Sequence, residues 1–271
     1  PMAAAIWSSP PNQMASFPAR SFARFFNNHG LLNIKDRPQW RTGVGGSHAY
    51  VGEILQDFNG NLISNNQAES VIRNNETVTV RLLDGSTIDC DEVVIATHAD
   101  EALGLLKAPT TNESQLLGAF KYQSNDTFLH TDTRLMPHRK SVWSSWNYLA
   151  NKIGEDVKSV SVTYWMNQLQ GLNTKDDYLV SLNPINEPDP DKVICRINYH
   201  HPVFDTPAIK AQHYLGQLQG VHNTWFAGSY FGYGFHEDAL ASAVNLCRDL
   251  GVIPPWEHNS NETLPVWMSA A

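Results

Sequence analysis

The stretch that decides the fold is residues 226–240, which read FAGSYFGYGFHEDAL. A short apolar segment, Thr224–Ala227, predicts a buried strand, and His236–Leu250 predicts a helix that ends at Gly251. Glycines in Gly228–Gly234 let the backbone approach a ligand closely, and the following helix points its free N–H groups and positive dipole end at that ligand. A phosphate or an electron-rich ring carbonyl suits such a site. A plain strand-to-helix turn with a tight bend is the alternative interpretation.

Residues 68–106 predict a second β-rich segment that ends in a helix. Two strands are expected at Ala68–Ile72 and Thr77–Leu82, with Asp84–Gly85 as a hairpin turn. Val93–Ala96 is a continuous apolar run, which is typical of a strand in a parallel sheet. A helix is expected to start within Thr97–Asp100 and to run through Leu106.

The first 60 residues predict two helices. Aromatic residues at helical spacing indicate a helix at about Ala19–Asn28 with Gly30 as its stop. The polar segment Ile34–Arg41 is expected to be a loop. The glycine turn Thr42–Ser47 is expected to place Ser47 as the N-cap of an amphipathic helix.

Residues 108–217 predict a second lobe built on a mixed or antiparallel sheet. Aromatic-rich strands are expected near Thr127–His130, Ser141–Trp146 and Ser159–Met166, and Pro184, Pro188 and Pro190 mark a long loop. His130 and Asp132 share one face of a strand, so they are either a proton relay or a satisfied polar pair. Four aromatic residues either line an apolar substrate cavity or belong to the core: Trp143, Trp146, Tyr164 and Trp165.

The composition excludes several classes of partner. Among 271 residues, 27 acidic side chains outnumber 19 basic ones, the formal net charge is −8, and no stripe of Lys and Arg is present. Nucleic acid and anionic membranes are therefore not expected as main partners. No apolar run reaches the roughly 18 residues that a spanning helix needs, so no stable membrane insertion is expected. Cys90, Cys195 and Cys247 lie far apart, which favours neither disulfides nor a zinc site and fits the cytoplasm.

Two catalytic motifs nearly match and are rejected. His236–Glu237 begins a zinc-protease pattern, but the position of the second ligand is Leu240. Gly45–Ala49 approximates a nucleophile elbow, which needs a buried apolar strand before it. The residues that precede it, Arg37–Arg41, make a poor strand. A hydrolase is therefore the weakest of the interpretations.

Several segments resemble parts of a known family. Phe226–Ser229 and Gly234–Ala239 are similar to the C-terminal flavin-binding signature of the amine-oxidase-like flavoproteins, and Gly45–Ser47 resembles their double-glycine segment. Val71 stands where that superfamily uses strand backbone against the adenine of FAD. Asp91–Ala99 looks like its second strand signature.

The resemblance is most specific to a bacterial group of NAD/FAD-binding amine-oxidase-like proteins. Its hallmark blocks span nearly the whole chain, at Arg37–Arg41, Ala96–Asp100, Leu129–Asp132, Ser145–Tyr148, Thr163–Asn167 and Gly232–Asp238. Members of the group tend to be linked with fatty-acid modification. The resemblance therefore implies a small apolar substrate of the fatty acyl type.

The resemblance implies FAD as the cofactor, with hydride or electron-pair transfer to it from a carbon or amine centre. It implies these cofactor-binding residues: Gly45, Gly46, Ser47, Val71, Ala96, Thr97, Gly228, Ser229, Gly234, Phe235, His236 and Ala239. His98 and His236 are the first candidates for a catalytic acid or base, because the motifs place both near the flavin ring and imidazole titrates in the useful range. Two alternatives stay open: a flavin-dependent isomerase or desaturase of fatty acyl chains, and a non-catalytic truncated chain or split subunit.

The expected fold class is α/β, with an incomplete FAD-binding lobe of the glutathione-reductase and amine-oxidase type and a mixed-sheet substrate lobe. The FAD-binding lobe is expected at 40–107 and 218–258, the substrate lobe at 1–39 and 108–217, and a C-terminal tail at 259–271. The Gly-x-Gly-x-x-Gly turn that cradles the FAD pyrophosphate is absent from this sequence. We therefore expect an N-terminal dinucleotide-binding segment to be missing here.

Overall fold

The computed structural model describes residues 6–7, 17–33, 35, 39, 41–74, 76–153 and 156–257. Most of the expected loop at 34–41 and the whole of the expected tail at 259–271 lie outside these residues. The chain divides into two compact units, each built from two stretches of sequence. Unit 1 comprises Pro1–Ile63 and Lys121–Thr206, and unit 2 comprises Ser64–Phe120 and Pro207–Ala271. The lobe boundaries expected from the sequence assign 40–63 to the flavin-binding part, and that assignment stays a prediction.

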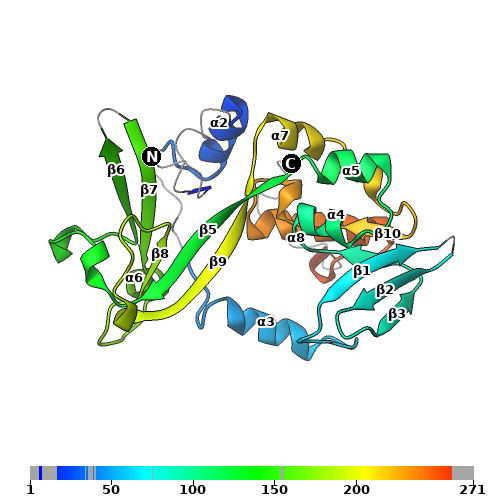
Figure 1. The fold of residues 1–271 in the computed structure, drawn as a ribbon, viewed down its shortest axis with the longest axis horizontal. Coiled ribbons are helices and arrows are strands. Elements are labelled where there is room, and N and C mark those ends of the chain that lie inside the picture. The colour runs from blue at the N-terminus through cyan, green and yellow to red at the C-terminus, as the bar shows by residue number, and fades with distance from the viewer. Residues whose placement is uncertain are drawn as a thin grey trace. The chain divides into compact units, whose positions relative to one another are not determined.

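Unit 1 is built on a five-stranded sheet in the order β6-β7-β8-β5-β9, in which every pair is antiparallel. Its strands are β5 (Lys121–His130), β6 (Trp146–Ile153), β7 (Asp156–Trp165), β8 (Leu179–Leu182) and β9 (Val193–Val203). Figure 1 shows β5 and β9 as a long pair at one side of this sheet and β6 and β7 at the other. The antiparallel sheet predicted for this region is confirmed.

Three strands of this sheet, β6, β8 and β9, differ from the sequence-based expectation. The strand expected at Ser141–Trp146 is wrong, because residues Lys140–Val142 form a short 3-10 helix and β6 begins only at Trp146. Asn147 determines where β6 begins, because its side chain binds the backbone of Ser144: its Oδ1 accepts from the N–H of Ser144, and its Nδ2 donates to the carbonyl of Ser144. Short β8 and long β9, on either side of the proline loop, were not predicted.

Unit 1 also contains two helices near the start of the chain, α2 (Ala19–Asn28) and α3 (Ser47–Gln56). Phe25 and Phe26 of α2 are buried, and Phe25 packs against Trp7 with ring centroids 4.7 Å apart. Helix α3 buries none of its side chains. The N-cap of α3 is Gly46, with a left-handed φ of 72°, so the expectation of a Ser47 cap is wrong by one residue: Ser47 is already the first helical residue and caps nothing.

Unit 2 contains a three-stranded antiparallel sheet and a two-stranded parallel one. The first consists of β1 (Ala68–Arg73), β2 (Val78–Leu82) and β3 (Thr87–Cys90), and the second of β4 (Val93–Ile95) and β10 (Thr224–Phe226). The hairpin turn at Asp84–Gly85 forms as predicted, with Asp84 Oδ1 accepting from the N–H of Ser86. The prediction of a parallel strand at Val93 is also confirmed.

Unit 2 contains the helices α4 (Ala99–Leu105), α5 (Thr111–Leu117), α7 (Thr206–Gln212) and α8 (His236–Asp249). Thr206, the first residue of α7, belongs to unit 1, and α6 (Met166–Gln170) also lies in unit 1. The prediction of α8 and of its glycine stop is confirmed, since Gly251 has a φ of 78° and its N–H donates to the carbonyl of Arg248. Short 3-10 helices include Leu215–Leu218 and Ser229–Phe231. No helix in the described ranges has the length and apolar character needed to cross a bilayer.

Candidate functional site: the edge of the parallel strand pair

The parallel pairing of β4 and β10 brings two predicted segments to one edge of unit 2. Because the strands run in the same direction, Ala96–His98 and Ala227–Ser229 leave from the same end of the pair. The N–H of Ala227 continues the ladder by donating to the carbonyl of Ile95. A Cβ placed on Gly228 would lie 3.5 Å from the carbonyl oxygen of Thr97. The two loops are therefore in direct contact.

Glycines in the turn after β10 stand where side chains do not fit. A Cβ on Gly228 would lie 2.6 Å from the ring of Tyr230, and one on Gly232 would lie 2.1 Å from Oδ1 of Asp238. Gly234 has a left-handed φ of 93°, which L-residues rarely adopt. The turn therefore requires glycine for its own packing. This supports the interpretation of a tight bend, and it also leaves bare backbone at the start of α8.

Two side chains that sequence reasoning missed hold this turn in place. Nε2 of Gln212 donates to the carbonyl oxygens of Tyr230 and Gly232, at 3.0 and 2.5 Å. The buried hydroxyl of Ser242 accepts from the N–H of Gly228 at 2.9 Å. A serine within the apolar face of α8 was the only signal for this in the sequence, and nothing marked Gln212, because its partners lie about twenty positions away.

The first turn of α8 presents unpaired backbone donors. Within the part of the chain that the structure describes, the N–H groups of His236 and Glu237 have no acceptor. The carboxylate of Asp238 folds back and accepts from the N–H of Phe235 at 2.9 Å. The helix start can therefore donate two hydrogen bonds to an oxygen-rich group. Its two acidic side chains favour a neutral carbonyl over a highly charged anion.

The predicted cofactor-binding residues fall into three places. Ala96, Thr97, Gly228, Ser229, Gly234, Phe235, His236 and Ala239 lie on the loops and helix start at the edge just described. Val71 is a buried residue of β1, and its carbonyl accepts from the N–H of Lys107 at 3.0 Å. Gly45, Gly46 and Ser47 belong to unit 1, where they form the turn into α3.

The two predicted catalytic histidines both lie on the segments that follow the parallel strands. His98 is the N-cap of α4, and its Nδ1 lies 3.9 Å from Oε1 of Glu101. His236 is the first residue of α8 and is exposed. Their catalytic roles stay a prediction.

A cavity of about 250 Å³ lies in unit 2 along one side of α8. Gly232 and Asp238 line it at the helix start, and Gln219, Ser242 and Asn245 line it further along. The side-chain amide of Gln219 forms hydrogen bonds with both backbone groups of Phe226 in β10: it donates to the carbonyl and accepts from the N–H. The candidate edge therefore adjoins an open space on one side of the helix.

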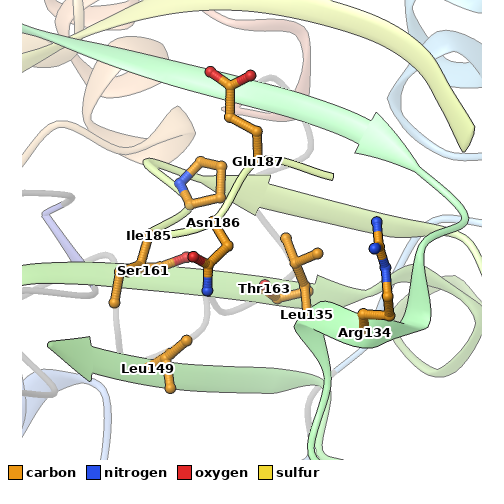
Figure 2. Close-up of a pocket in the computed structure, with 9 residues that line it drawn as sticks. Arg134, Leu135, Leu149, Ser161, Thr163, Ile185, Asn186 and Glu187 are labelled. Atoms are coloured by element: carbon orange, nitrogen blue, oxygen red, sulfur yellow. The ribbon is translucent and has the colours of Figure 1, made fainter. Parts of the chain in front are cut away.

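Unit 1 carries a second pocket, of about 280 Å³, against its antiparallel sheet (Figure 2). Its wall combines apolar side chains (Leu135, Leu149 and Ile185), two hydroxyls (Ser161 and Thr163) and the guanidinium of Arg134. The predicted substrate-cavity aromatics do not line it. They form two edge-to-face pairs instead, Trp143 with Trp165 and Trp146 with Tyr164.

A buried polar chain lies behind this pocket. Nε2 of His130 is 2.8 Å from Oγ of Ser181, which is 2.7 Å from Oγ1 of Thr163. Nδ1 of His130 accepts from the backbone N–H of Asp132, and the carboxylate of Asp132 pairs with Arg134. Of the two interpretations for His130 and Asp132, the satisfied polar pair is therefore the one formed, because their carboxylate and imidazole do not hydrogen-bond.

The pKa values in this chain follow from those contacts. Hydrogen bonds from Arg134 and from the N–H groups of Asp189 and Arg134 outweigh burial, so the pKa of Asp132 lies far below its ordinary value. Burial lowers the pKa of His130, against the opposing effect of the Asp132 charge. At neutral pH, Asp132 is therefore ionised and His130 is neutral.

Together, the fold and the edge site describe a two-unit α/β protein in which a glycine turn leads from a parallel strand into a helix. The sequence profile of the family "Flavin containing amine oxidoreductase" matches residues 10–192, and the chain belongs to this family. The proteins that this family describes are flavin-containing amine oxidoreductases, and FAD is the cofactor of that class. The resemblance drawn from the sequence is confirmed.

Solved structures share the fold at low sequence identity. A fatty acid isomerase from P. acnes that produces CLA aligns with a TM-score of 0.53 and 12% identity, over 76% of this chain and 52% of its own. Putrescine oxidase bound to putrescine aligns with a TM-score of 0.52 and 11% identity, over 76% and 53%. Reduced UDP-galactopyranose mutase aligns with a TM-score of 0.52 and 12% identity, over 76% and 52%. The chain thus spans about half the length of these structures. No curated protein sequence matches it.

The residues at the edge of unit 2 fit part of a flavin cofactor. The glycine turn keeps side chains away from the start of α8, and the N–H groups of His236 and Glu237 are free to donate. Those donors suit the carbonyl edge of a flavin ring or the hydroxyls of its ribityl chain. A pyrophosphate cradle is not among the features of this edge.

Proposed function

We propose that this chain is the C-terminal part of an FAD-dependent oxidoreductase of the amine-oxidase type, which acts on a small apolar substrate. The observation that carries the proposal is the bare strand-to-helix turn at the end of β10, with two free N–H groups beside the loop that follows β4. When bound, FAD supplies the redox step by accepting a hydride or an electron pair. The protein would bind and orient the cofactor and the substrate and would move the proton.

The residues of the edge would position the flavin rather than react with it. Gly228, Ser229 and Gly234 would let the cofactor approach the backbone, and the N–H groups of His236 and Glu237 would donate to it. The positive end of α8 would stabilise negative charge that develops at a ring carbonyl. His98 and His236 would be the groups that hold or move a proton, since both lie on the segments that bound this edge.

The parallel pair β4–β10 supports the proposal that a dinucleotide-binding segment completes unit 2. Two-strand parallel sheets rarely stand alone, because parallel strands are normally buried on both faces. Here the side chain of Val94 in β4 is 47% exposed. The related structures are about one and a half times as long as the chain, and its aligned part spans about half of their length. A segment carrying the Gly-x-Gly-x-x-Gly turn would supply both the missing strands and the pyrophosphate cradle.

The substrate proposal has two versions that differ in reaction outcome. The shared fold includes an oxidase of putrescine and an isomerase of fatty acids, so the fold alone does not choose between them. For oxidation, an amine or saturated carbon centre would reduce the flavin under anaerobic conditions. For isomerisation, the double bond of an unsaturated acyl chain would move with no net flavin reduction.

The test is a visible absorbance spectrum of desalted protein after incubation with FAD, recorded for this chain and for a version extended upstream. We expect flavin bands to be retained by the extended protein alone. In that protein, Gly228→Ala should lose them, because its Cβ would collide with Tyr230, whereas Gly104→Ala should keep them, because its Cβ meets nothing within 4 Å. A thermal melt of each variant confirms that it is folded. Absence of flavin from both lengths of the protein would refute the proposal.

A product assay then separates the two reaction types. Ammonia, peroxide or a new carbonyl identifies oxidation, and a shifted double bond without loss of flavin colour identifies isomerisation. A retained flavin with neither outcome, across amines and unsaturated acyl chains, would contradict both substrate versions while leaving the cofactor assignment intact.

A further inference from the structure

The buried residues behind the pocket of unit 1 determine which pocket groups donate hydrogen bonds. The backbone N–H of Asp132 can only donate, so Nδ1 of His130 must accept and must carry no proton. The neutral imidazole therefore holds its hydrogen on Nε2 and donates it to Ser181. Either hydroxyl can be the donor in the bond between Ser181 and Thr163. Because Ser181 is fully buried and its hydroxyl has no other acceptor among the described residues, donation from Ser181 to Oγ1 of Thr163 is the arrangement that leaves no hydrogen of Ser181 unpaired.

In this series of hydrogen bonds from His130 to Thr163, the hydroxyl hydrogen of Thr163 is left over. Oγ1 of Thr163 accepts from Ser181, and among the described residues the hydroxyl hydrogen of Thr163 has no acceptor. Thr163 is only 3% exposed, yet it lines the pocket. Its hydroxyl is therefore a donor that is available to whatever occupies the pocket.

Two further donors reach the same space. Ser161 is 3% exposed, lines the pocket, and has no hydrogen-bond partner for its hydroxyl in the described ranges. Arg134 uses Nε and one terminal nitrogen, Nη2, on Asp132, and its Nη1 has no partner within the same ranges. Two buried hydroxyls and one guanidinium nitrogen thus offer three donors on one wall, while Asn186 and Glu187 also line the pocket. The three donors suit a ligand that presents acceptor oxygens to this wall.

The acidic group of the pocket does not reverse this preference. Glu187 lines the rim, is largely exposed, and lies 3.8 Å from the guanidinium of Arg196. Figure 2 shows its carboxylate extending away from Thr163 and Leu149. The buried charge of Asp132 is matched by Arg134, and the carboxylate of Glu187 faces Arg196 at the rim.

We infer that this pocket binds a small organic carboxylate, whose oxygens accept from Thr163, Ser161 and Arg134 and whose short aliphatic body contacts Leu135, Leu149 and Ile185. The volume of about 280 Å³ lies near the lower end of the range for ligand pockets, roughly 300–1,000 Å³, so the ligand is small. The pocket lies wholly in unit 1, and the inference does not rest on flavin binding.

Isothermal titration of this chain with hexanoate and with hexylamine tests the inference, because the two probes share a chain and differ in head group. Hexanoate should bind, and hexylamine should bind at least about tenfold more weakly, since an ammonium cannot accept from the three donors and is repelled by the guanidinium charge of Arg134. Thr163→Val should weaken hexanoate binding about tenfold by removing one hydrogen bond to a charged group, and Thr163→Ser should restore it.

A second pair of variants avoids the buried chain. Leu149 is about half exposed and lies opposite Ser161 in the sheet, so Leu149→Trp should fill the pocket and abolish hexanoate binding while the protein stays folded. Ile197→Trp is the matched control, at an exposed position of the same sheet that does not line the pocket, and it should bind as the parent does. Equal binding of the two probes, no hexanoate binding at all, or equal effects of the two tryptophans would each overturn the inference. None of these results would bear on flavin retention.

Discussion

Among the described residues, the carboxylates of Glu113 and Asp132 are fully buried, and each is held by an arginine. Glu113 accepts from both terminal nitrogens of Arg73 and from the N–H of Thr110, which completes a capping box at the start of α5. The pairing of Arg73 with Glu113 was not predicted, because the two residues lie 40 positions apart and nothing in the local sequence pattern connects them.

Glu113→Ala is expected to lower the free energy of unfolding by about 3–5 kcal/mol, because it leaves Arg73 buried and unpaired. The matched control is Glu69→Ala, which breaks an exposed ion pair with Arg81 in the same unit and should cost less than about 1 kcal/mol. Urea unfolding of the two variants measures both. Similar losses would mean that burial of the Arg73 pair does not matter.

Asp132 makes the stability of unit 1 depend on pH. Because its pKa is lower in the folded protein than in the unfolded chain, the ionised carboxylate contributes stability above the ordinary aspartate range, and that contribution is lost as pH falls through the folded pKa. Asp132→Asn should therefore be less stable at neutral pH and should lose less stability on acidification. Unfolding curves at about pH 7 and pH 2 compare it with Asp176→Asn, an exposed control that should keep the pH dependence of the parent. An unchanged slope in Asp132→Asn would contradict the assignment.

At the element scale, the sequence identified the pieces whose signals are local. Helices α2 and α8, the hairpin at Asp84–Gly85 and the strand at Val93 all carry periodicity or turn chemistry within a few residues. The strand start at Trp146 was misplaced because the side chain of Asn147 binds the backbone of Ser144 and holds that segment out of the sheet. The polar chain from His130 to Thr163 joins three strands, so its order follows from sheet pairing that no single stretch encodes.

The same scale sets the requirement for glycine before α8. Gly232→Ala is expected to cost about 1–3 kcal/mol, because the new methyl group would displace the Asp238 carboxylate that binds the N–H of Phe235. Gly104→Ala, in the open space of α4, should instead stabilise by up to about 1 kcal/mol. Thermal unfolding of both variants gives the comparison. A neutral Gly232→Ala would show that this turn adjusts to a side chain.

For the whole molecule, cofactor binding should be visible as protection of one unit more than the other. In the upstream-extended protein, FAD should slow hydrogen exchange in peptides covering 95–99 and 226–240, since those backbone groups form the candidate edge. The β6–β7 pair of unit 1 serves as the internal control and should exchange at the same rate with and without FAD. Protection confined to β6–β7 would place the cofactor elsewhere.

The parallel pairing of β4 and β10 also determines an order of events during synthesis. Val93 pairs with Thr224, 131 positions later, so β4 leaves the ribosome long before its partner exists. In the interval the chain completes β5 and β9, and their pairing sets Lys121 directly against Val203. Once that ladder has formed, the segment between the two halves of unit 2 no longer behaves as a long flexible loop, because its two ends already lie side by side. Folding of Lys121–Thr206, which lies between the two halves of unit 2 in the sequence, therefore brings those halves close together. This lowers the entropic cost of pairing β10 with β4.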